Sequence, residues 1–93
     1  MIRGFADRET QALFEGRRVR QFEPFRAQAE RKLVMLQQAK RLLDLAAIPG
    51  NRLEALEGSR KGQFSIRIND RWRLCFTWAG EFADHVQIVD YHR

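Results

Sequence analysis

The sequence predicts an α+β domain in which two N-terminal helices pack on one face of a small antiparallel sheet. In the first half, apolar residues recur every three to four positions, and in the second half they alternate with polar residues. Pro49 and Gly50 lie between the two patterns and form a strong helix stop. With 93 residues, 44% of them hydrophobic, the chain suffices for one compact domain over residues 1–93.

Residues 1–49 contain the signals for both helices. Asp7 can cap a first helix that runs through Glu15 and ends at Gly16. A second, longer helix is expected to begin at Pro24, a residue suited to the first helical turn, and to break near Lys40. Ala12, Leu13 and Phe14 supply the buried side of the first helix. The apolar stripe of the second consists of Phe25, Ala29, Leu33, Leu36, Ala39 and Leu43.

The segments 63–69 and 71–78 read as half-buried strands, because apolar and polar residues alternate along both. Weaker strands are expected at 52–56 and 85–91, and residues 1–5 resemble an edge strand. Helices followed by consecutive strands are typical of an α+β domain with an antiparallel meander.

The pairing of the two clear strands places arginines opposite one another. Their apolar residues must share the core face, which a three-residue loop at 69–71 achieves. The expected core pairs are Ile68 with Trp72, Ile66 with Leu74 and Phe64 with Phe76. The same register puts Arg67 directly opposite Arg73 on the other face.

Two opposed guanidinium groups repel each other, and a bound phosphate would relieve that repulsion. We therefore favour an anion site at Arg67 and Arg73. The alternative is that these arginines extend into solvent or pair with Glu54 or Glu57. Three further basic residues are expected to extend this anion-binding patch: Arg60, Lys61 and Arg71.

The charge balance points to an acidic partner. Seventeen basic residues against twelve acidic ones give a net charge of +5, and arginine makes planar two-pronged contacts with phosphate. This excess suggests nucleic acid or an acidic protein as the partner, although a merely solubilising surface explains the charge equally well. Cys75 is the only cysteine, and His85 and His92 are the only histidines, so we expect no metal and no cofactor. Without an apolar membrane span or signal peptide, a cytoplasmic location and no membrane contact are expected.

The C-terminal residues offer the chemistry of a metal-free ribonuclease. Such an enzyme needs a base for the RNA 2′-hydroxyl, an acid for the leaving 5′-oxygen and cations for the phosphate oxygens. His92 can act as acid or base, Tyr91 can donate a proton or stack on a base, and Arg73 can stabilise the developing charge. Alternatively, His92 is a solvated tail residue, Tyr91 caps the core and Asp90 pairs with an arginine.

Four segments resemble the HigB family of toxins in the RelE/ParE superfamily, most closely its GraT-like branch. They are residues 49–56 (PGNRLEAL), 58–63 (GSRKGQ), 65–76 (SIRINDRWRLCF) and 88–92 (IVDYH). The resemblance implies a RelE-like microbial ribonuclease fold and metal-independent cleavage of messenger RNA on the translating ribosome. It also implies neutralisation by a HigA-type helix-turn-helix antitoxin, with operator DNA bound only through that complex.

The resemblance maps the catalytic arginine of the family onto Arg73 and its C-terminal segment onto Asp90, Tyr91 and His92. Many members carry His and Lys where this chain has Glu54 and Glu57, and an acidic residue where it has Ser59. Glu57 in place of a cation should weaken phosphate binding, so we expect a weaker toxin in which His92 carries more of the acid–base role. Glu54 offers a carboxylate that can serve as a base. Two alternatives stay open: a non-cleaving ribosome- or RNA-binding growth inhibitor, and a ParE-like gyrase inhibitor. Arg73→Ala is expected to leave the fold intact because the side chain points away from the predicted core.

Overall fold

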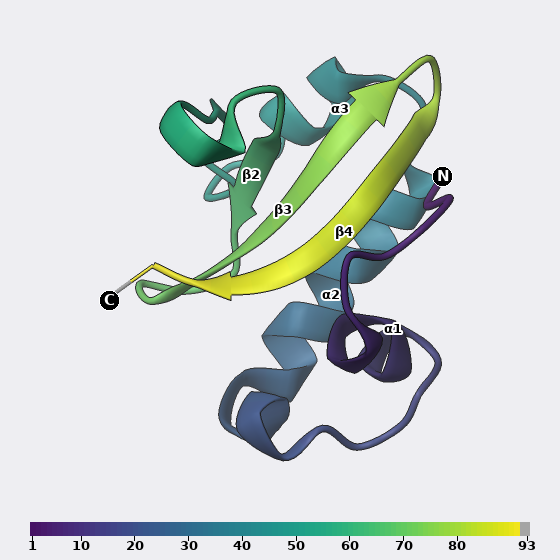
Figure 1. Cartoon of the computed structure of the whole chain (residues 1–93), viewed down its shortest axis with the longest axis vertical. Helices are drawn as coiled ribbons and strands as arrows, with labels where there is room; N and C mark the ends of the chain where they lie inside the picture. Colours follow the sequence, from purple (N-terminus) through teal and green to yellow (C-terminus); the bar gives the residue numbers. More distant parts are fainter. Residues whose placement is uncertain (92–93) are drawn as a thin grey trace.

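A computed structural model describes residues 1–91 and has helices packed against one four-stranded sheet (Figure 1). The helices are α1 (Arg8–Phe14), α2 (Arg26–Gln38) and α3 (Leu42–Ala46), with 3-10 turns η1 (Arg20–Phe25) and η2 (Gly58–Arg60). The strands are β1 (Glu54–Ala55), β2 (Phe64–Arg67), β3 (Trp72–Ala79) and β4 (Phe82–Asp90). The order β1-β2-β3-β4, with every neighbouring pair antiparallel, confirms the α+β meander.

The first helix begins and ends as its sequence predicts. Asp7 precedes α1, and its Oδ1 accepts the Thr10 backbone N–H at 2.8 Å, which satisfies one of the free donors of the first turn. Gly16 follows the helix with a φ of 88°, a left-handed conformation that glycine adopts without steric cost. Of the residues expected on its buried side, Leu13 is buried, whereas Phe14 is 36% exposed.

The second helix begins and breaks near the predicted positions. Pro24 lies in η1, and α2 starts two residues later, at Arg26. The break near Lys40 is confirmed, because Ala39 has an extended backbone and α3 begins at Leu42. The expectation that Leu43 belongs to the core stripe is wrong: its side chain is 68% exposed, and Leu45 is fully buried instead. The extended residue resets the helical phase, so the periodicity of α2 does not continue into α3.

The strand register agrees with the parity argument. Phe64 pairs with Phe76, Ile66 with Leu74, and Arg67 with Arg73. The two weaker strands differ most from prediction, since β1 is only two residues long and β4 begins at Phe82. A bulge beside Asp84 and His85 interrupts the alternation there, which concealed the start of β4 from the sequence pattern.

The hydrophobic core lies between the helices and the face of the sheet that carries the even-numbered β2 and β3 residues. Trp72 packs at one end of it, where its ring stacks on Phe25 at 4.9 Å and meets the edge of Phe22 at 5.8 Å. The sheet residues buried in this core are Ile66, Ile68, Leu74, Phe76, Ala83, Val86 and Ile88. Odd-numbered residues of β2 and β3 therefore lie on the opposite face, which we call the open face.

The outer edge of β4 is covered by the start of the chain. Ile2 and Phe5 form parallel bridges with Ala83 and Val86, which accounts for the edge strand expected in residues 1–5 (Figure 1). Farther along, the Ile88 backbone N–H donates to Oγ1 of Thr10 at 3.0 Å. These contacts satisfy donors of an edge strand that would otherwise be open to pairing with another chain.

Thr10→Val is expected to lower the free energy of unfolding by about 1–3 kcal/mol, because the buried Ile88 N–H loses its acceptor. Thr10 is completely buried, so water does not replace the lost hydroxyl. Chemical denaturation of both proteins measures the difference. Thr10→Ser keeps the hydroxyl and serves as the control; equal stability of the Val and Ser variants would contradict the assignment.

The helices of residues 1–91 are all too short or too polar to cross a lipid bilayer.

Candidate functional site

Arg73 is the best-anchored charged side chain on the open face. Its Nε donates to Ser65 Oγ at 2.8 Å, and its Nη2 donates to the backbone oxygens of Arg52 at 2.6 Å and Ser65 at 3.3 Å. Only 8% of the residue is exposed, although it points away from the helices. The Arg73 guanidinium is thus held in one orientation across β2 and the segment before β1.

Tyr91 lies beside this guanidinium. The Arg73 Cζ is 5.6 Å from the centre of the Tyr91 ring, within the range of a cation–π contact. The Tyr91 backbone N–H donates to Arg71 O at 2.7 Å, which extends the pairing of β4 beyond its last residue. Tyr91 is 42% exposed, so its ring does not cap the core and is accessible to a ligand. His92, the other C-terminal candidate, lies outside the described residues.

The floor of the open face is made by residues that the sequence reasoning did not assign to the site. Ser65 and Cys75 are fully buried there, and Gln87 follows them in the same row across the sheet. Arg60 reaches over this row, with Nη1 donating to Gln63 Oε1 at 3.1 Å and Gln87 Oε1 at 3.4 Å. Strand parity could have identified Ser65, Cys75 and Gln87, because they share the face of Arg73.

The Cys75 thiol lies close to Arg60, Arg73 and Tyr91, and all three affect its pKa. Burial raises its pKa, while the positive charges of Arg60 and Arg73 and a hydrogen bond from the Tyr91 side chain oppose that increase. The raised pKa keeps the thiol protonated, so Cys75 is not an activated nucleophile. Its position nevertheless shows that Arg60, Arg73 and Tyr91 converge on one place.

Each of the two opposed arginines contacts a different carboxylate, and the shared anion site stays a prediction. Arg67 pairs with Asp70 in the loop between β2 and β3. Arg73 has its own carboxylate, Glu54, whose Oε1 lies 3.5 Å from Nη2. The alternative of pairing with a nearby carboxylate is therefore correct for Arg73. Each guanidinium thus has a carboxylate of its own, which reduces the repulsion between the two arginines.

Asp90 and Arg71 pair with each other. Arg71 donates to Asp90 Oδ2 from Nε at 2.9 Å and from Nη2 at 2.7 Å, and the carboxylate raises the pKa of Arg71. Asp90 pairs with Trp72, a residue of the core face, so its side chain starts on the core side of the sheet. Tyr91, the next residue, points to the opposite face because successive side chains of a strand alternate. The Asp90 carboxylate is thus bound to Arg71, and its side chain starts on the face opposite to that of Arg73.

The remaining predicted residues lie around the margin of the site. The Glu54 side chain is 57% exposed beside Arg73, and Glu57 precedes η2 on the surface. Lys61 is exposed directly after η2. Arg73 does point away from the core, as the sequence predicts, but its side chain is buried and donates to three acceptors, so we expect its removal to lower the stability of the fold.

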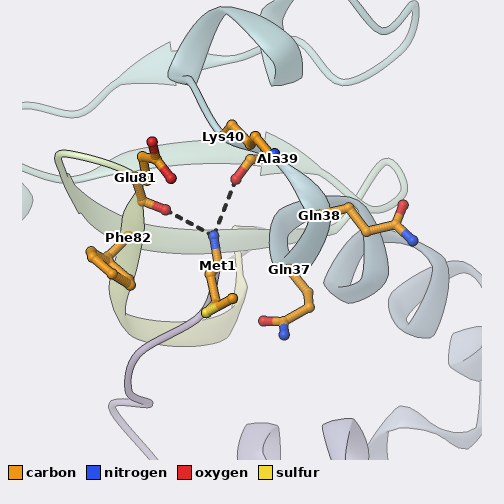
Figure 2. Close-up of a pocket in the computed structure, with 7 residues that line it drawn as sticks. All are labelled: Met1, Gln37, Gln38, Ala39, Lys40, Glu81 and Phe82. Carbon is orange, nitrogen blue, oxygen red and sulfur yellow. Dashed lines mark hydrogen bonds between the residues drawn. The ribbon is translucent and has the colours of Figure 1, made fainter.

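A pocket of about 140 Å³ lies at the other end of the β3–β4 hairpin (Figure 2). Figure 2 shows the Met1 amino group donating to Glu81 O at 2.9 Å and Ala39 O at 3.1 Å. Its lining includes none of the predicted site residues. Residues 1–91 contain no group of three or more His, Cys, Asp or Glu side chains placed to hold a metal ion.

Two comparisons with known proteins indicate the same family of toxins. Residues 3–92 match the family model described as "RelE-like toxin of type II toxin-antitoxin system HigB". Toxin HigB-1 of Vibrio cholerae serotype O1 is 49% identical over 53 residues, a match covering 57% of this chain. That match spans 56% of the relative, little more than half its length. The family match covers nearly the whole chain, including β3 with Arg73 and the residues after β4. The chain therefore belongs to the HigB-like family of RelE-like toxins of type II toxin–antitoxin systems.

Proposed function

We propose that this toxin is a metal-independent endoribonuclease that cuts messenger RNA on the translating ribosome and so inhibits translation and growth. The observation that carries the proposal is the Arg73–Tyr91 pair, a buried and fixed guanidinium beside an accessible aromatic ring on the open face. A preoriented cation stabilises charge that develops on a phosphate, because no reorganisation is needed during the reaction. An exposed aromatic ring beside it provides a stacking surface for an RNA base.

The proposed reaction is transfer of the phosphoryl group to the neighbouring ribose oxygen. A base removes the proton of the 2′-hydroxyl, the oxygen bonds to phosphorus, and the bond to the 5′-oxygen breaks. Arg73 stabilises the negative equatorial oxygens, and Glu54, whose side chain is 57% exposed beside Arg73, is proposed as the base that accepts the 2′-proton. His92 is proposed as the acid that protonates the leaving 5′-oxygen, with Tyr91 holding the substrate.

The other predicted residues take supporting roles in this proposal. Asp90 fixes the end of β4, and with it Tyr91, through its pair with Arg71. Arg60, Lys61 and Arg67 supply positive charge for the RNA backbone around the site, a contribution that salt weakens.

Family membership supports an antitoxin as the partner, proposed here to be a HigA-type helix-turn-helix protein. Operator DNA would be bound only through that complex. The ribosome and its message, encountered in the cytoplasm, are the proposed target, and the GraT-like branch is the proposed subgroup.

A non-cleaving growth inhibitor is the second candidate, and the Glu54–Arg73 contact favours it. A carboxylate 3.5 Å from Nη2 competes with the phosphate for the same guanidinium. Purified toxin added to translating ribosomes separates the two functions. Cleavage predicts new message ends carrying 2′,3′-cyclic phosphate, whereas slowed translation with intact messages would overturn the nuclease proposal. Damage to DNA without either effect would indicate a gyrase inhibitor.

Glu57→Lys is expected to increase cleavage and growth arrest by several-fold. The substitution replaces a negative charge near the site with a positive one, which strengthens attraction of the RNA backbone. Cleavage rates at two salt concentrations measure the change, and the gain should shrink at the higher salt. Glu23→Lys makes the same charge change on exposed η1 and is the control. Equal activity of wild type and Glu57→Lys would count against the prediction.

A further inference from the structure

His85 occupies a strained position in the bulge of β4. Cys75 pairs with Gln87, but the next open-face residue of β3, Thr77, pairs with Asp84, so β4 contains one extra residue. His85 has a φ of 52°, in the left-handed region. Bulges with a left-handed residue commonly place glycine there, because a side chain is sterically costly. The histidine ring at this position lies on the open face beside Thr77 and is exposed, so a ligand can reach it.

The hydrogen bonds around His85 determine which ring nitrogen carries a proton. Thr77 Oγ1 donates its only hydrogen to the Asp84 backbone oxygen at 3.3 Å. The same Oγ1 lies 3.2 Å from His85 Nδ1 and must act as the acceptor in that contact. Nδ1 therefore carries the proton, and in the neutral ring Nε2 is a hydrogen-bond acceptor. Within residues 1–91, Nε2 makes no hydrogen bond, and His85 is exposed.

The charges next to the ring are already balanced. Asp84 Oδ1 accepts the His85 backbone N–H at 2.9 Å, and Asp84 Oδ2 pairs with Arg3 Nε at 3.2 Å. The carboxylate is thus occupied on both oxygens and does not compete for Nε2. Gly4 gives this carboxylate room, because a Cβ at Gly4 would lie 2.4 Å from Asp84 Oδ1. The bulge is bonded to β3 through Thr77 and to the start of the chain through Arg3.

The ring lies on the same face as the proposed cleavage site but too far away to act on the same phosphate. Thr77 follows Arg73 and Cys75 on the open face, four residues from Arg73, which corresponds to roughly 13 Å along a strand. Gln87, held by Arg60, lies between the ring and Tyr91 on β4. An RNA strand lying along β4 would therefore pass Tyr91, then Arg60, then His85.

We propose that His85 forms a second nucleotide subsite, in which Nε2 accepts a hydrogen bond from a nucleotide that flanks the cleaved bond. This subsite rests on the proposed RNA-cutting function, because it assumes that RNA occupies the open face. The donor is either a ribose 2′-hydroxyl or an N–H of the base edge. Thr77 is a positioning residue, since it fixes the tautomer and the orientation of the ring.

The test is His85→Gly, which removes the ring while suiting the left-handed backbone. The melting temperature should stay equal to that of wild type or rise, because the strain is relieved. Affinity for a fluorescently labelled nine-nucleotide RNA should fall roughly 3- to 10-fold, the loss of one hydrogen bond. Affinity for a three-nucleotide RNA, too short to reach from Tyr91 to the bulge, should not change. Thr77→Val should weaken nonamer binding in the same direction.

Single 2′-deoxy substitutions in the nonamer distinguish the two donors. If the deoxy sugar at one position lowers the affinity of wild type but not that of His85→Gly, the donor to His85 is the ribose 2′-hydroxyl at that position. If a base analogue gives the same result, the donor is the base edge. Unchanged nonamer binding by His85→Gly, or equal losses for both RNA lengths, would overturn the subsite. Intact messages on the ribosome would overturn the cleavage proposal alone, because the binding comparison uses free RNA and no cleavage readout.

Discussion

Arg73→Ala is expected to reduce RNA cleavage by about 100-fold or more, the usual effect of losing a preoriented electrostatic stabiliser. The loss also has a structural component. The buried Ser65 Oγ and Ser65 O and the half-buried Arg52 O lose their donor, which should lower the free energy of unfolding by about 1–3 kcal/mol. Cleavage assays on translating ribosomes, run beside thermal unfolding, measure both effects on the same preparation.

Arg73→Lys separates charge from geometry. Lysine keeps the positive charge but is a point donor without the planar fork that spans Ser65 and Arg52. We therefore expect most of the activity to be lost with this variant too. Arg8→Ala removes a charge from the exposed start of α1 and is the control. Full toxicity of a folded Arg73→Ala protein would show that the guanidinium is not part of the catalytic site.

Phe76→Ala is expected to destabilise the protein by about 3–5 kcal/mol, the typical cost of removing a large buried aromatic side chain. Phe76 is fully buried in the central strand β3 and lies 6.4 Å, between ring centres, from both Phe64 and Trp78. A small domain has little more stability than this to lose, so much of the variant should be unfolded at growth temperature. Urea denaturation of the purified protein measures the change.

The matched control is Phe82→Ala, which removes the same side chain from the start of β4. Phe82 is 39% exposed, so its removal leaves no enclosed cavity and should cost much less. A small loss at Phe76, comparable to that at Phe82, would contradict the packing described for β3. The stability measurements also serve as a control for the activity assays, because a toxin variant loses its activity when it unfolds.

These two predictions concern opposite faces of one strand. Phe76 and Leu74 pack into the core, while Arg73 and Cys75 lie on the open face. Both sets of side chains extend from the same backbone, so we expect loss of core packing at Phe76 to affect Arg73 as well.

Local sequence was sufficient for the fold class, the helix ends and the central register. Period and capping residues are local properties, so the cap at Asp7, the break near Lys40 and the pairing of Ile66 with Leu74 follow without the structure. Family resemblance was also readable from the sequence, because it rests on the order of residues in the hairpin.

Tertiary structure alone decided which side chains meet. Strand parity placed Arg67 and Arg73 opposite each other, but it did not show that Asp70 and Glu54 neutralise them separately. Nor did it show that Arg73 is buried, that Asp90 holds Arg71, or that a bulge turns His85 onto the open face. The physical reason is that long charged side chains choose partners by distance in space, and neither periodicity nor parity encodes that distance.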